Sequence, residues 1–337
     1  MSRRRQTNRT IPDHISRRIE DAGLDGYSVI TEIARGGSST VYLGEHLTTG
    51  ERVALKALHP AYVDHSDMVQ RLLAEHQVAG RARHPGLLGI HRAAQTSQGI
   101  PYLVMEYLDG ESLGELIDRT ALPIGSIIAI AAQVASAVAA LHTASVAHCD
   151  LKPDNVFVLY EMGPGGWPRI KVIDYGVARL HNEPPLEDGM IVGTPAFMAP
   201  EQWAGAPTTA SDVYALGCML YELITGEPVF SGALPQLMAG HCGRTPTVPI
   251  AYCSEIDAAL NALIVRMLAK QAAMRPTMAE VDAALATLAP LAFGPRPAVA
   301  ALAVHAQLAS FNTRDRGWEA PGFRASEIAA PGLDATG

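Results

Sequence analysis

The pattern of hydrophobic positions changes about a third of the way along the chain. From Tyr27 to Glu106, short runs of β-branched and aromatic residues are separated by turn residues, which is typical of β-strands. One longer amphipathic segment, Ser66–Arg83, has the spacing of a helix and is followed by Pro85-Gly86. We therefore expect a sheet of five strands crossed by one helix. The predicted strands are Tyr27–Ala34, Thr40–His46, Arg52–Leu58, Leu87–Ala93 and Tyr102–Glu106.

Beyond Gly110 the apolar residues recur at helical spacing. The segment Ile124–Thr143 is rich in Ala, Ile and Val with few polar positions, so we expect a helix buried on most sides. A second helix is predicted to open with Ser211-Asp212 at its cap and to close at Gly226. Two more are expected at Ser254–Ala269 and Thr277–Leu288. After Pro290 the periodicity is weak and Ala, Pro and Gly dominate, which favours a linker-like tail.

These patterns together predict an α+β fold with two lobes. The small β-rich lobe would cover residues 27–106, a connection would cover 106–110, and the helical lobe would cover 111–289. Residues 1–26 contain six arginines and are predicted to form a flexible basic arm. The arm is either a solvated tail or a docking segment for an acidic partner. Residues 290–337 form the predicted tail.

Composition narrows the class of protein. The chain has 337 residues, of which 48% are hydrophobic and 18% charged, so it can bury a large core. The formal net charge of −8 gives no support to nucleic-acid binding. The four cysteines show no CxxC pair, which favours a reduced, cytoplasmic protein. No apolar run is long enough to predict a membrane span, and the N-terminal residues lack the core of a signal peptide.

The chemistry is concentrated in His148-Cys149-Asp150-Leu151-Lys152-Pro153-Asp154-Asn155, which combines an acid, a lysine and an amide within eight residues. Asp174-Tyr175-Gly176 follows nineteen residues after Asn155. This order and spacing resembles the catalytic core of the eukaryotic-like (Hanks-type) bacterial serine/threonine protein kinases. The resemblance implies that Asp150 orients the acceptor hydroxyl as the base and that Lys152 stabilises charge on the γ-phosphate. It also implies that Asn155 and Asp174 hold Mg²⁺, or Mn²⁺ in its place.

The small lobe carries the nucleotide-binding part of the same resemblance. Lys56, in Val53-Ala54-Leu55-Lys56, would contact the α- and β-phosphates of ATP, and Glu75 would hold it. In the family's glycine-rich turn, two of the three glycine positions differ here, at Ala34 and Ser39. The residues that the resemblance places against ATP are Ile33, Gly36, Gly37, Val41, Ala54, Lys56, Met105, Glu106 and Leu108.

Four further residues resemble parts of the family's protein-substrate lobe. Thr194 would hydrogen-bond with the base and the lysine, as in the serine/threonine branch. Asp212 would hold the catalytic loop, and Glu201 would pair with Arg275 inside the large lobe. A serine or threonine of a protein substrate is therefore the expected acceptor, and the oligomeric state stays open.

One residue of the catalytic segment departs from the family. Cys149 stands where most members carry an arginine that receives a phosphate from the activation loop. The stretch Gly176–Gly193 contains no serine, threonine or tyrosine. The arginine that would bind a phosphate and the hydroxyl residues that would carry one are both missing. We therefore expect activity that is independent of phosphorylation within this loop.

Two other classes of function remain open at this point. A pseudokinase, which would bind nucleotide or act as a scaffold with little turnover, is favoured by Ala34 and Ser39 and opposed by the retained catalytic residues. A small-molecule kinase of the antibiotic-phosphotransferase type shares the Asp-x4-Asn core. The segment Ala199-Pro200-Glu201 and Arg275 favour a protein substrate instead.

Overall fold

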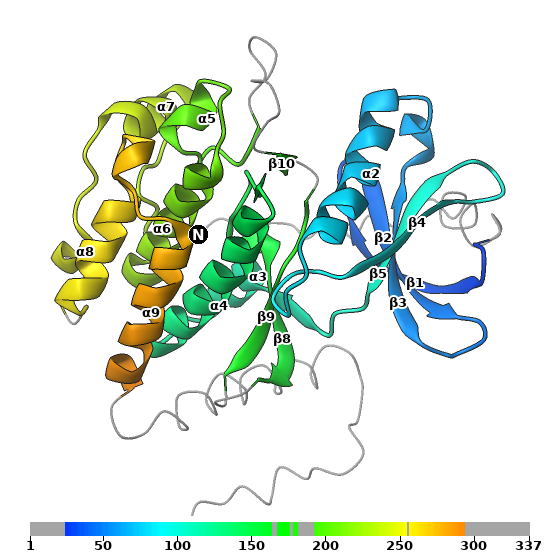
Figure 1. The fold of residues 1–337 in the computed structure, drawn as a ribbon, viewed down its shortest axis with the longest axis horizontal. Coiled ribbons are helices and arrows are strands. Elements are labelled where there is room, and N and C mark those ends of the chain that lie inside the picture. Colours follow the sequence, from blue (N-terminus) through cyan, green and yellow to red (C-terminus); the bar gives the residue numbers. More distant parts are fainter. Residues whose placement is uncertain (1–23, 164–166, 176–177, 181–191, 255, 294–337) are drawn as a thin grey trace, which may run out of the picture.

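The computed structural model describes residues 24–163, 167–175, 178–180, 192–254 and 256–293, which form two lobes (Figure 1). The small lobe contains an antiparallel sheet of five strands in the order β1-β2-β3-β5-β4. The two-lobed α+β fold is therefore confirmed. The strands are β1 (Tyr27–Arg35), β2 (Ser39–His46), β3 (Arg52–Leu58), β4 (Ile90–Gln95) and β5 (Pro101–Glu106).

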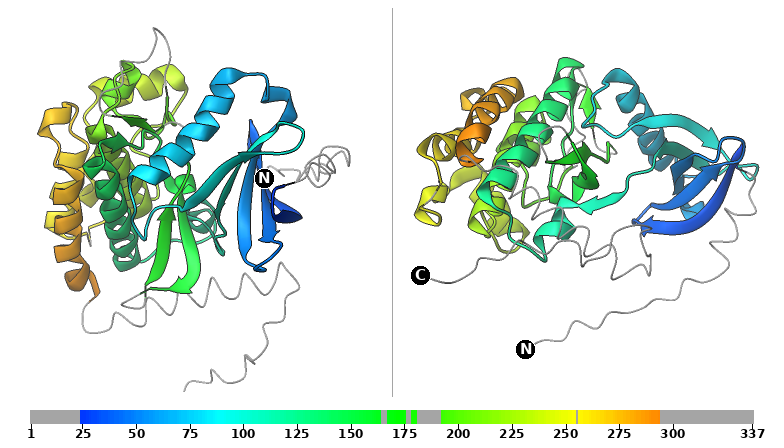
Figure 2. Two further views of the ribbon diagram at one scale, coloured as in Figure 1. Left: turned by 45° about the vertical axis from the view of Figure 1, so that its right-hand side comes forward. Right: turned by 90° about the horizontal axis from the view of Figure 1, so that it is seen from below.

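Helix α2 (Ser66–Arg81) lies against the small-lobe sheet on the side of β4 and β5 (Figures 1 and 2). A short 3₁₀ turn, η1 (Pro60–Tyr62), precedes it. The buried residues of α2 are Leu72, Glu75 and Val78, which recur every three residues and so share one face. Because one of these three is a carboxylate, the helix needs a cationic partner on the side that faces the protein.

The predicted fourth strand was misplaced. The expected segment was Leu87–Ala93, whereas β4 begins at Ile90. The backbone N–H of Leu88 instead donates to the carbonyl of Val172 in the large lobe at 3.0 Å, and Leu87 forms a parallel bridge with the same residue. The apolar start of the predicted strand thus packs between the lobes, where its side chains join the main core.

The large lobe is mainly helical. Its helices are α3 (Leu113–Ile117), α4 (Ile124–Thr143), α5 (Pro200–Trp203), α6 (Thr209–Thr225), α7 (Leu234–Gly243), α8 (Ala258–Met267) and α9 (Met278–Phe293). Its 3₁₀ turns are η2 (Pro153–Asn155), η3 (Pro249–Ala251) and η4 (Ala272–Met274). The helices α3, α5 and α7 were not predicted, and α9 continues beyond its expected end at Leu288.

Two small sheets in the large lobe also escaped prediction. One has the order β6-β8-β9 and the other pairs β10 with β7. Their strands are β6 (Gly110–Ser112), β7 (Val146–Ala147), β8 (Val156–Met162), β9 (Pro168–Val172) and β10 (Arg179–Leu180). Strands of two to seven residues with continuous apolar runs give no alternation by which to recognise them.

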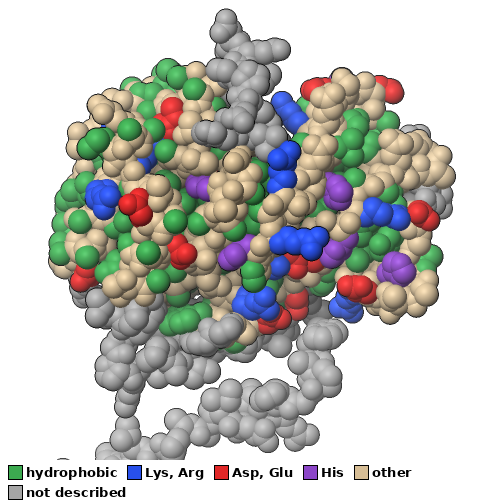
Figure 3. Space-filling view, viewed as in Figure 1, with side chains coloured by type: hydrophobic (Ala, Val, Ile, Leu, Met, Phe, Trp, Pro, Cys, Tyr) green, Lys and Arg blue, Asp and Glu red, His purple; other side chains and the backbone are tan. Residues whose placement is uncertain are grey.

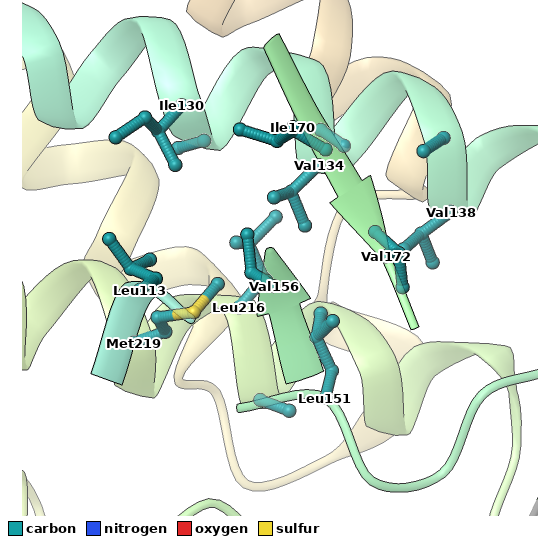
Figure 4. Close-up of a cluster of buried hydrophobic side chains, with 14 of the residues drawn as sticks. Leu113, Ile130, Val134, Val138, Leu151, Val156, Ile170, Val172, Leu216 and Met219 are labelled. Carbon is teal, nitrogen blue, oxygen red and sulfur yellow. The ribbon is translucent and has the colours of Figure 1, made fainter. Parts of the chain in front are cut away.

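Helix α4 is the centre of the large lobe, packed against α6, α9 and β9. Figure 4 shows Ile130, Val134 and Val138 of α4 facing Ile170 and Val172 of β9. Among the described helices α4 alone is long and apolar enough to cross a membrane, but 67% of its most apolar window is buried within the protein. Its apolar composition is therefore explained by this core.

The start of α6 differs from the prediction in a way that matters for the site. Thr208 caps the helix by accepting a hydrogen bond from the Ala210 N–H, while Ser211 and Asp212 lie buried in the first turn. The predicted cap at Ser211 was therefore wrong. The predicted end was right, because Gly226 closes α6 with a φ of 75°, a left-handed conformation that glycine adopts without strain. Asp212 is consequently free of a capping role and points to the catalytic loop.

Candidate active site

An ion pair joins the two main elements of the small lobe. Lys56 of β3 donates to both carboxylate oxygens of Glu75 on α2, at 2.7 and 2.8 Å. Asp174 approaches the same ammonium group at 3.5 Å from the large lobe. Burial disfavours the charged form of Lys56, but the carboxylates of Glu75 and Asp174 outweigh that effect and raise the pKa of the ammonium group. The three predicted residues are therefore brought together.

The turn between β1 and β2 closes on itself without help from glycine. The Gly36 N–H donates to the Ser39 carbonyl at 2.9 Å, and neither Gly36 nor Gly37 has a positive φ. A Cβ added at Gly37 would meet nothing within 4 Å. The conformation of the turn therefore does not require glycine at position 37.

The predicted adenine-facing residues fall into two groups. Ala54 of β3 and Met105 of β5 are paired in the sheet and buried in the main core, and the partly buried Val41 and Leu108 pack against the same core. Ile33 differs: it is 45% exposed and lies at an irregularity in the pairing of β1 with β2. The structure thus gathers the first four side chains but leaves Ile33 at the exposed edge.

The connection between the lobes contains a contact that the sequence did not reveal. The carboxylate of Glu106 accepts hydrogen bonds from the Gly89 N–H and from Lys171 of β9, the latter at 2.6 Å. Lys171 also donates to the Leu87 carbonyl at 3.1 Å. Lys171 is one of two charged residues in β9, so its charge gave no signal for this pair. The pair fixes the connection to the large lobe.

Asp150 lies at the centre of a hydrogen-bond network. Thr194 donates its hydroxyl proton to Asp150 Oδ1 at 2.7 Å, and Lys152 Nζ donates to Thr194 Oγ1 at 2.9 Å. The Lys152 ammonium group also lies 3.1 Å from Asp150 Oδ2. The Asn155 side-chain amide donates to the Asp150 carbonyl at 2.8 Å and more weakly to Oδ2 at 3.3 Å. The predicted base, lysine, amide and threonine therefore meet around one carboxylate.

Two buried side chains hold the backbone on which Asp150 sits. Asp212 of α6 accepts from the N–H groups of His148 and Cys149, both at 2.8 Å, and its Oδ2 lies 2.8 Å from His142 Nε2. His148 Nε2 in turn contacts the Ile173 carbonyl at 3.1 Å, directly before Asp174. The catalytic loop and the strand that leads to Asp174 are therefore joined. The anchoring role expected of Asp212 agrees with this geometry.

Strained backbone marks the same places. Apart from Ser145, the described non-glycine residues with positive φ are Cys149 at 66° and Asp174 at 67°. The left-handed region costs of order 1 kcal/mol for such residues, so surrounding bonds must hold them there. Cys149 itself is only 3% exposed. Its side chain therefore packs inside the lobe, where Sγ lies 3.6 Å from the Ala147 carbonyl.

The residues expected to bind metal offer the right donor atoms. The Asn155 NH₂ group is turned to Asp150, which leaves Oδ1 as the ligating atom, while the Asp174 side chain is 47% exposed. Nowhere in the described part of the chain do three or more His, Cys, Asp or Glu residues gather into a metal site. A hard cation such as Mg²⁺ at two oxygen ligands would take further oxygens from nucleotide phosphates, which fits its usual coordination in such sites.

The region that follows Thr194 is held by a buried ion pair. Arg275 pairs with both carboxylate oxygens of Glu201, at 2.6 and 2.9 Å, and Ser211 donates to the same carboxylate at 2.7 Å. The Arg275 side chain is fully buried. Such a two-point pair fixes orientation as well as distance, so α5 is held firmly against α6.

The predicted regulatory loop lies only partly within the described residues. Of the stretch Gly176–Gly193, residues 176–177 and 181–191 lie outside the described residues. Directly before it, Tyr175 is 1% exposed, and its hydroxyl reaches the carbonyls of Leu88 and Val172 at 3.4 Å. Burial raises the pKa of this hydroxyl. Tyr175 packs against the edge of the His148 ring, a contact that joins the Asp174 turn to the catalytic loop.

Fold and site together define a protein kinase domain, and the sequence comparisons agree. Residues 27–284 match the family model for the protein kinase domain, so the chain belongs to that family. It is 38% identical over 250 residues to the serine/threonine-protein kinase Pkn1 of Myxococcus xanthus, an alignment that covers 73% of this chain and 35% of Pkn1.

A second relative gives the same result. The chain is 32% identical over 285 residues to the serine/threonine-protein kinase PknB of Mycobacterium leprae, covering 82% of this chain and 44% of PknB. The chain thus spans between a third and a half of the length of these curated relatives.

Proposed function

We propose that this chain transfers the γ-phosphoryl group of ATP to serine or threonine hydroxyls of protein substrates. The observation that carries the proposal is the network in which Thr194 and Lys152 converge on the Asp150 carboxylate. The Lys56–Glu75 pair supplies the nucleotide end of the same site. Both ends are required, because phosphoryl transfer is accelerated mainly by positioning and charge stabilisation.

ATP would bind with its adenine between the lobes. Val41, Ala54 and Met105 supply apolar surface, and Leu108 and Glu106 supply backbone groups for pairing with the purine. The Glu106 N–H already donates to the Gly89 carbonyl at 3.0 Å, so we assign the Glu106 contact to its carbonyl oxygen. The α- and β-phosphates would then lie near Lys56.

Asn155 and Asp174 would hold Mg²⁺, with Mn²⁺ as the substitute. The bound ion neutralises charge on the phosphates as the reaction proceeds. Asn155 is already oriented for this role, because its NH₂ group is fixed by the Asp150 carbonyl. Asp174 is held by the contacts of Ile173 with His148 and Asn155.

The acceptor hydroxyl would displace neither Lys152 nor Thr194. It donates its hydrogen bond to Asp150 and is thereby oriented toward the γ-phosphorus. As the new O–P bond forms, the bond to the β-phosphate oxygen breaks and the hydroxyl proton passes to Asp150. Lys152 lies 3.1 Å from that carboxylate and supplies positive charge beside the transferred group.

We further propose that this activity needs no phosphate on the activation loop. Cys149 offers no cationic side chain to receive one, and the Lys56–Glu75 pair and the Asp150 network are both formed in the unmodified chain. The cytoplasmic location stays a prediction from the sequence, and the oligomeric state is left open.

Transfer of labelled phosphate from ATP to generic protein acceptors tests the proposed activity. Wild type and Asp118→Asn, an exposed residue at the end of α3, should transfer phosphate, whereas Asp150→Asn and Lys56→Met should not. No transfer by the wild type alongside retained ATP binding would support the pseudokinase alternative and reject the proposal.

Phosphate independence needs a separate experiment. Protein treated with a phosphatase, and shown by mass spectrometry to be unmodified, should have the same initial rate as untreated protein. A lag that ends as autophosphorylation proceeds would contradict the proposal.

A further inference from the structure

Gln202 is a buried amide that no part of the proposed chemistry uses. It lies on the short helix α5, directly after Glu201, and is only 2% exposed. Its Nε2 donates to the Cys149 carbonyl at 2.8 Å and to the Val192 carbonyl at 3.2 Å. Its Oε1 accepts from the Ala199 N–H at 3.0 Å. These partners fix which end of the amide carries the nitrogen, because two carbonyls require a donor.

The two carbonyls belong to segments that are distant in sequence but adjacent to the reacting groups. Cys149 directly precedes Asp150, and Val192 lies two residues before Thr194. The hydroxyl of Thr194 is in turn bonded to the Asp150 carboxylate at 2.7 Å. One amide therefore sets the separation of the two backbone segments whose side chains must meet.

The packing at this contact leaves no room for another arrangement. Gly193 has a φ of 115°, and a Cβ there would lie 2.9 Å from Gln202 Nε2 and 3.0 Å from the Cys149 carbonyl. The distance to Nε2 is shorter than real Cβ atoms show, and the distance to the Cys149 carbonyl is tighter than nearly all Cβ contacts. Glycine at this position thus lets the end of the activation segment approach the catalytic loop and the amide at once.

The contact made by Gln202 needs no phosphate on the activation loop. The amide carries no net charge, and the nearby side chain of Cys149 is buried. Leaving a buried donor or acceptor unpaired costs about 1–3 kcal/mol. Removing the amide would expose two carbonyls and one N–H to that cost. This favours the joined arrangement without any modification.

We propose that Gln202 is a positioning residue that locks the catalytic loop to the end of the activation segment in the unphosphorylated enzyme. It acts through Cys149 and Val192 and touches neither nucleotide nor acceptor. This proposal rests on the proposed kinase function. The Gln202 contact would take the place of the family's contact between a loop phosphate and the arginine that Cys149 replaces.

The test is Gln202→Met, which keeps the length and apolar stem of the side chain and removes the amide. We expect kcat for a protein acceptor to fall about 10- to 100-fold, in line with the loss of two buried hydrogen bonds, while KM for ATP changes less than about twofold. The matched control is Trp203→Phe, which changes the neighbouring buried residue of α5 and leaves the hydrogen bonds of Gln202 in place. Its kcat should stay that of the wild type.

Gly193→Ala makes the inference testable if Gln202→Met does not fold. It leaves Gln202 in place and pushes the two segments apart, so it should give the same selective loss of kcat. Wild-type kcat in the folded fraction of either variant would overturn the proposal. The proposed function would fail separately, through absence of transfer by the wild type, whereas an inactive Asp150→Asn beside a fully active Gln202→Met would reject only the lock.

Discussion

The acceptor side and the nucleotide side of this site are held by different kinds of contact. On the acceptor side, all within one lobe, Thr194 donates a short hydrogen bond to Asp150, and the buried amide of Gln202 donates to the Cys149 carbonyl. On the nucleotide side, Lys56 and Glu75 form an ion pair between a strand and a helix, and Asp174 reaches it across the lobes at 3.5 Å. The first arrangement is local to one rigid core, and the second depends on how three elements sit relative to one another.

We expect the two sides to be controlled differently. Buried hydrogen bonds within a packed lobe form as that lobe folds, so we expect the acceptor side to form without modification of the chain. An ion pair between elements can be broken by a shift of α2 without unfolding the protein. We therefore expect modification or a partner to act on the nucleotide side, and the predictions below test the two sides in order of expected effect.

The largest effect is expected from Thr194→Ala. It removes the hydroxyl that donates to Asp150 and receives Lys152, so the base loses its orientation and the lysine its anchor. We expect kcat to fall about 100-fold with ATP affinity unchanged, measured by steady-state kinetics. Thr194→Ser, which keeps the hydroxyl, should retain most of the activity. An equal loss in the serine variant would show that shape, not the hydrogen bond, matters here.

The second prediction concerns the stability of the core beneath the acceptor side. His241 on α7 is fully buried, with Nδ1 3.0 Å from the Tyr214 hydroxyl. Burial, and then the nearby Lys270, lower its pKa from 6.5 to about 4. The unfolded chain therefore takes up this proton first as pH falls. The stabilising contribution is complete above pH 6.5 and is lost as pH falls from 6.5 toward 4, by about 3 kcal/mol.

Denaturant unfolding at a series of pH values measures this contribution. His241→Gln should lower stability at neutral pH and flatten its dependence between pH 6.5 and 4. His91→Gln, on the exposed surface of β4, should keep the dependence of the wild type. If His241→Gln retained the full acid-dependent loss, another group would be responsible.

The third prediction breaks the nucleotide side. Glu75→Gln keeps the shape of the side chain but, among the described residues, removes the closer of the two carboxylates that pair with the Lys56 ammonium and leaves Asp174 at 3.5 Å. We expect kcat/KM for ATP to fall about 10-fold, which corresponds to about 1.4 kcal/mol. Asp67→Asn, an exposed carboxylate in the first turn of the same helix, is the control and should change neither constant. A variant as impaired as Thr194→Ala would mean that the two sides are not independent.

The same division explains which parts of the molecule were predictable. The helices at Ile124–Thr143 and Ser66–Arg81 have long periodic patterns, so their place in the chain was evident. The groups around Asp150 lie within eight residues or in a segment that resembles the family. By contrast, the Glu106–Lys171 pair and the role of Gln202 depend on contacts between residues 53 to 65 positions apart. No local pattern encodes such contacts.

The misplaced strand has a related cause. The run Leu87-Leu88 has the composition of a strand. It packs between the lobes instead, because the core there takes up apolar side chains from both lobes. Burial decides whether these two leucines join the sheet or the interface between the lobes. A single sequence does not show which surface will bury a given apolar residue.

The smallest expected effect comes from Gly37→Ala, which asks whether the glycine-rich turn serves the nucleotide or the fold. Gly37 has no positive φ and open space around it, so alanine should leave the free energy of unfolding unchanged or slightly higher. If phosphates approach its backbone, a methyl group there should raise KM for ATP about threefold, roughly 0.7 kcal/mol. Gly99→Ala is the matched opposite, because its φ of 80° makes alanine strained in an equally open place. It should lower stability and leave KM unchanged. Equal KM values in the two variants would show that the turn at Gly37 does not approach ATP.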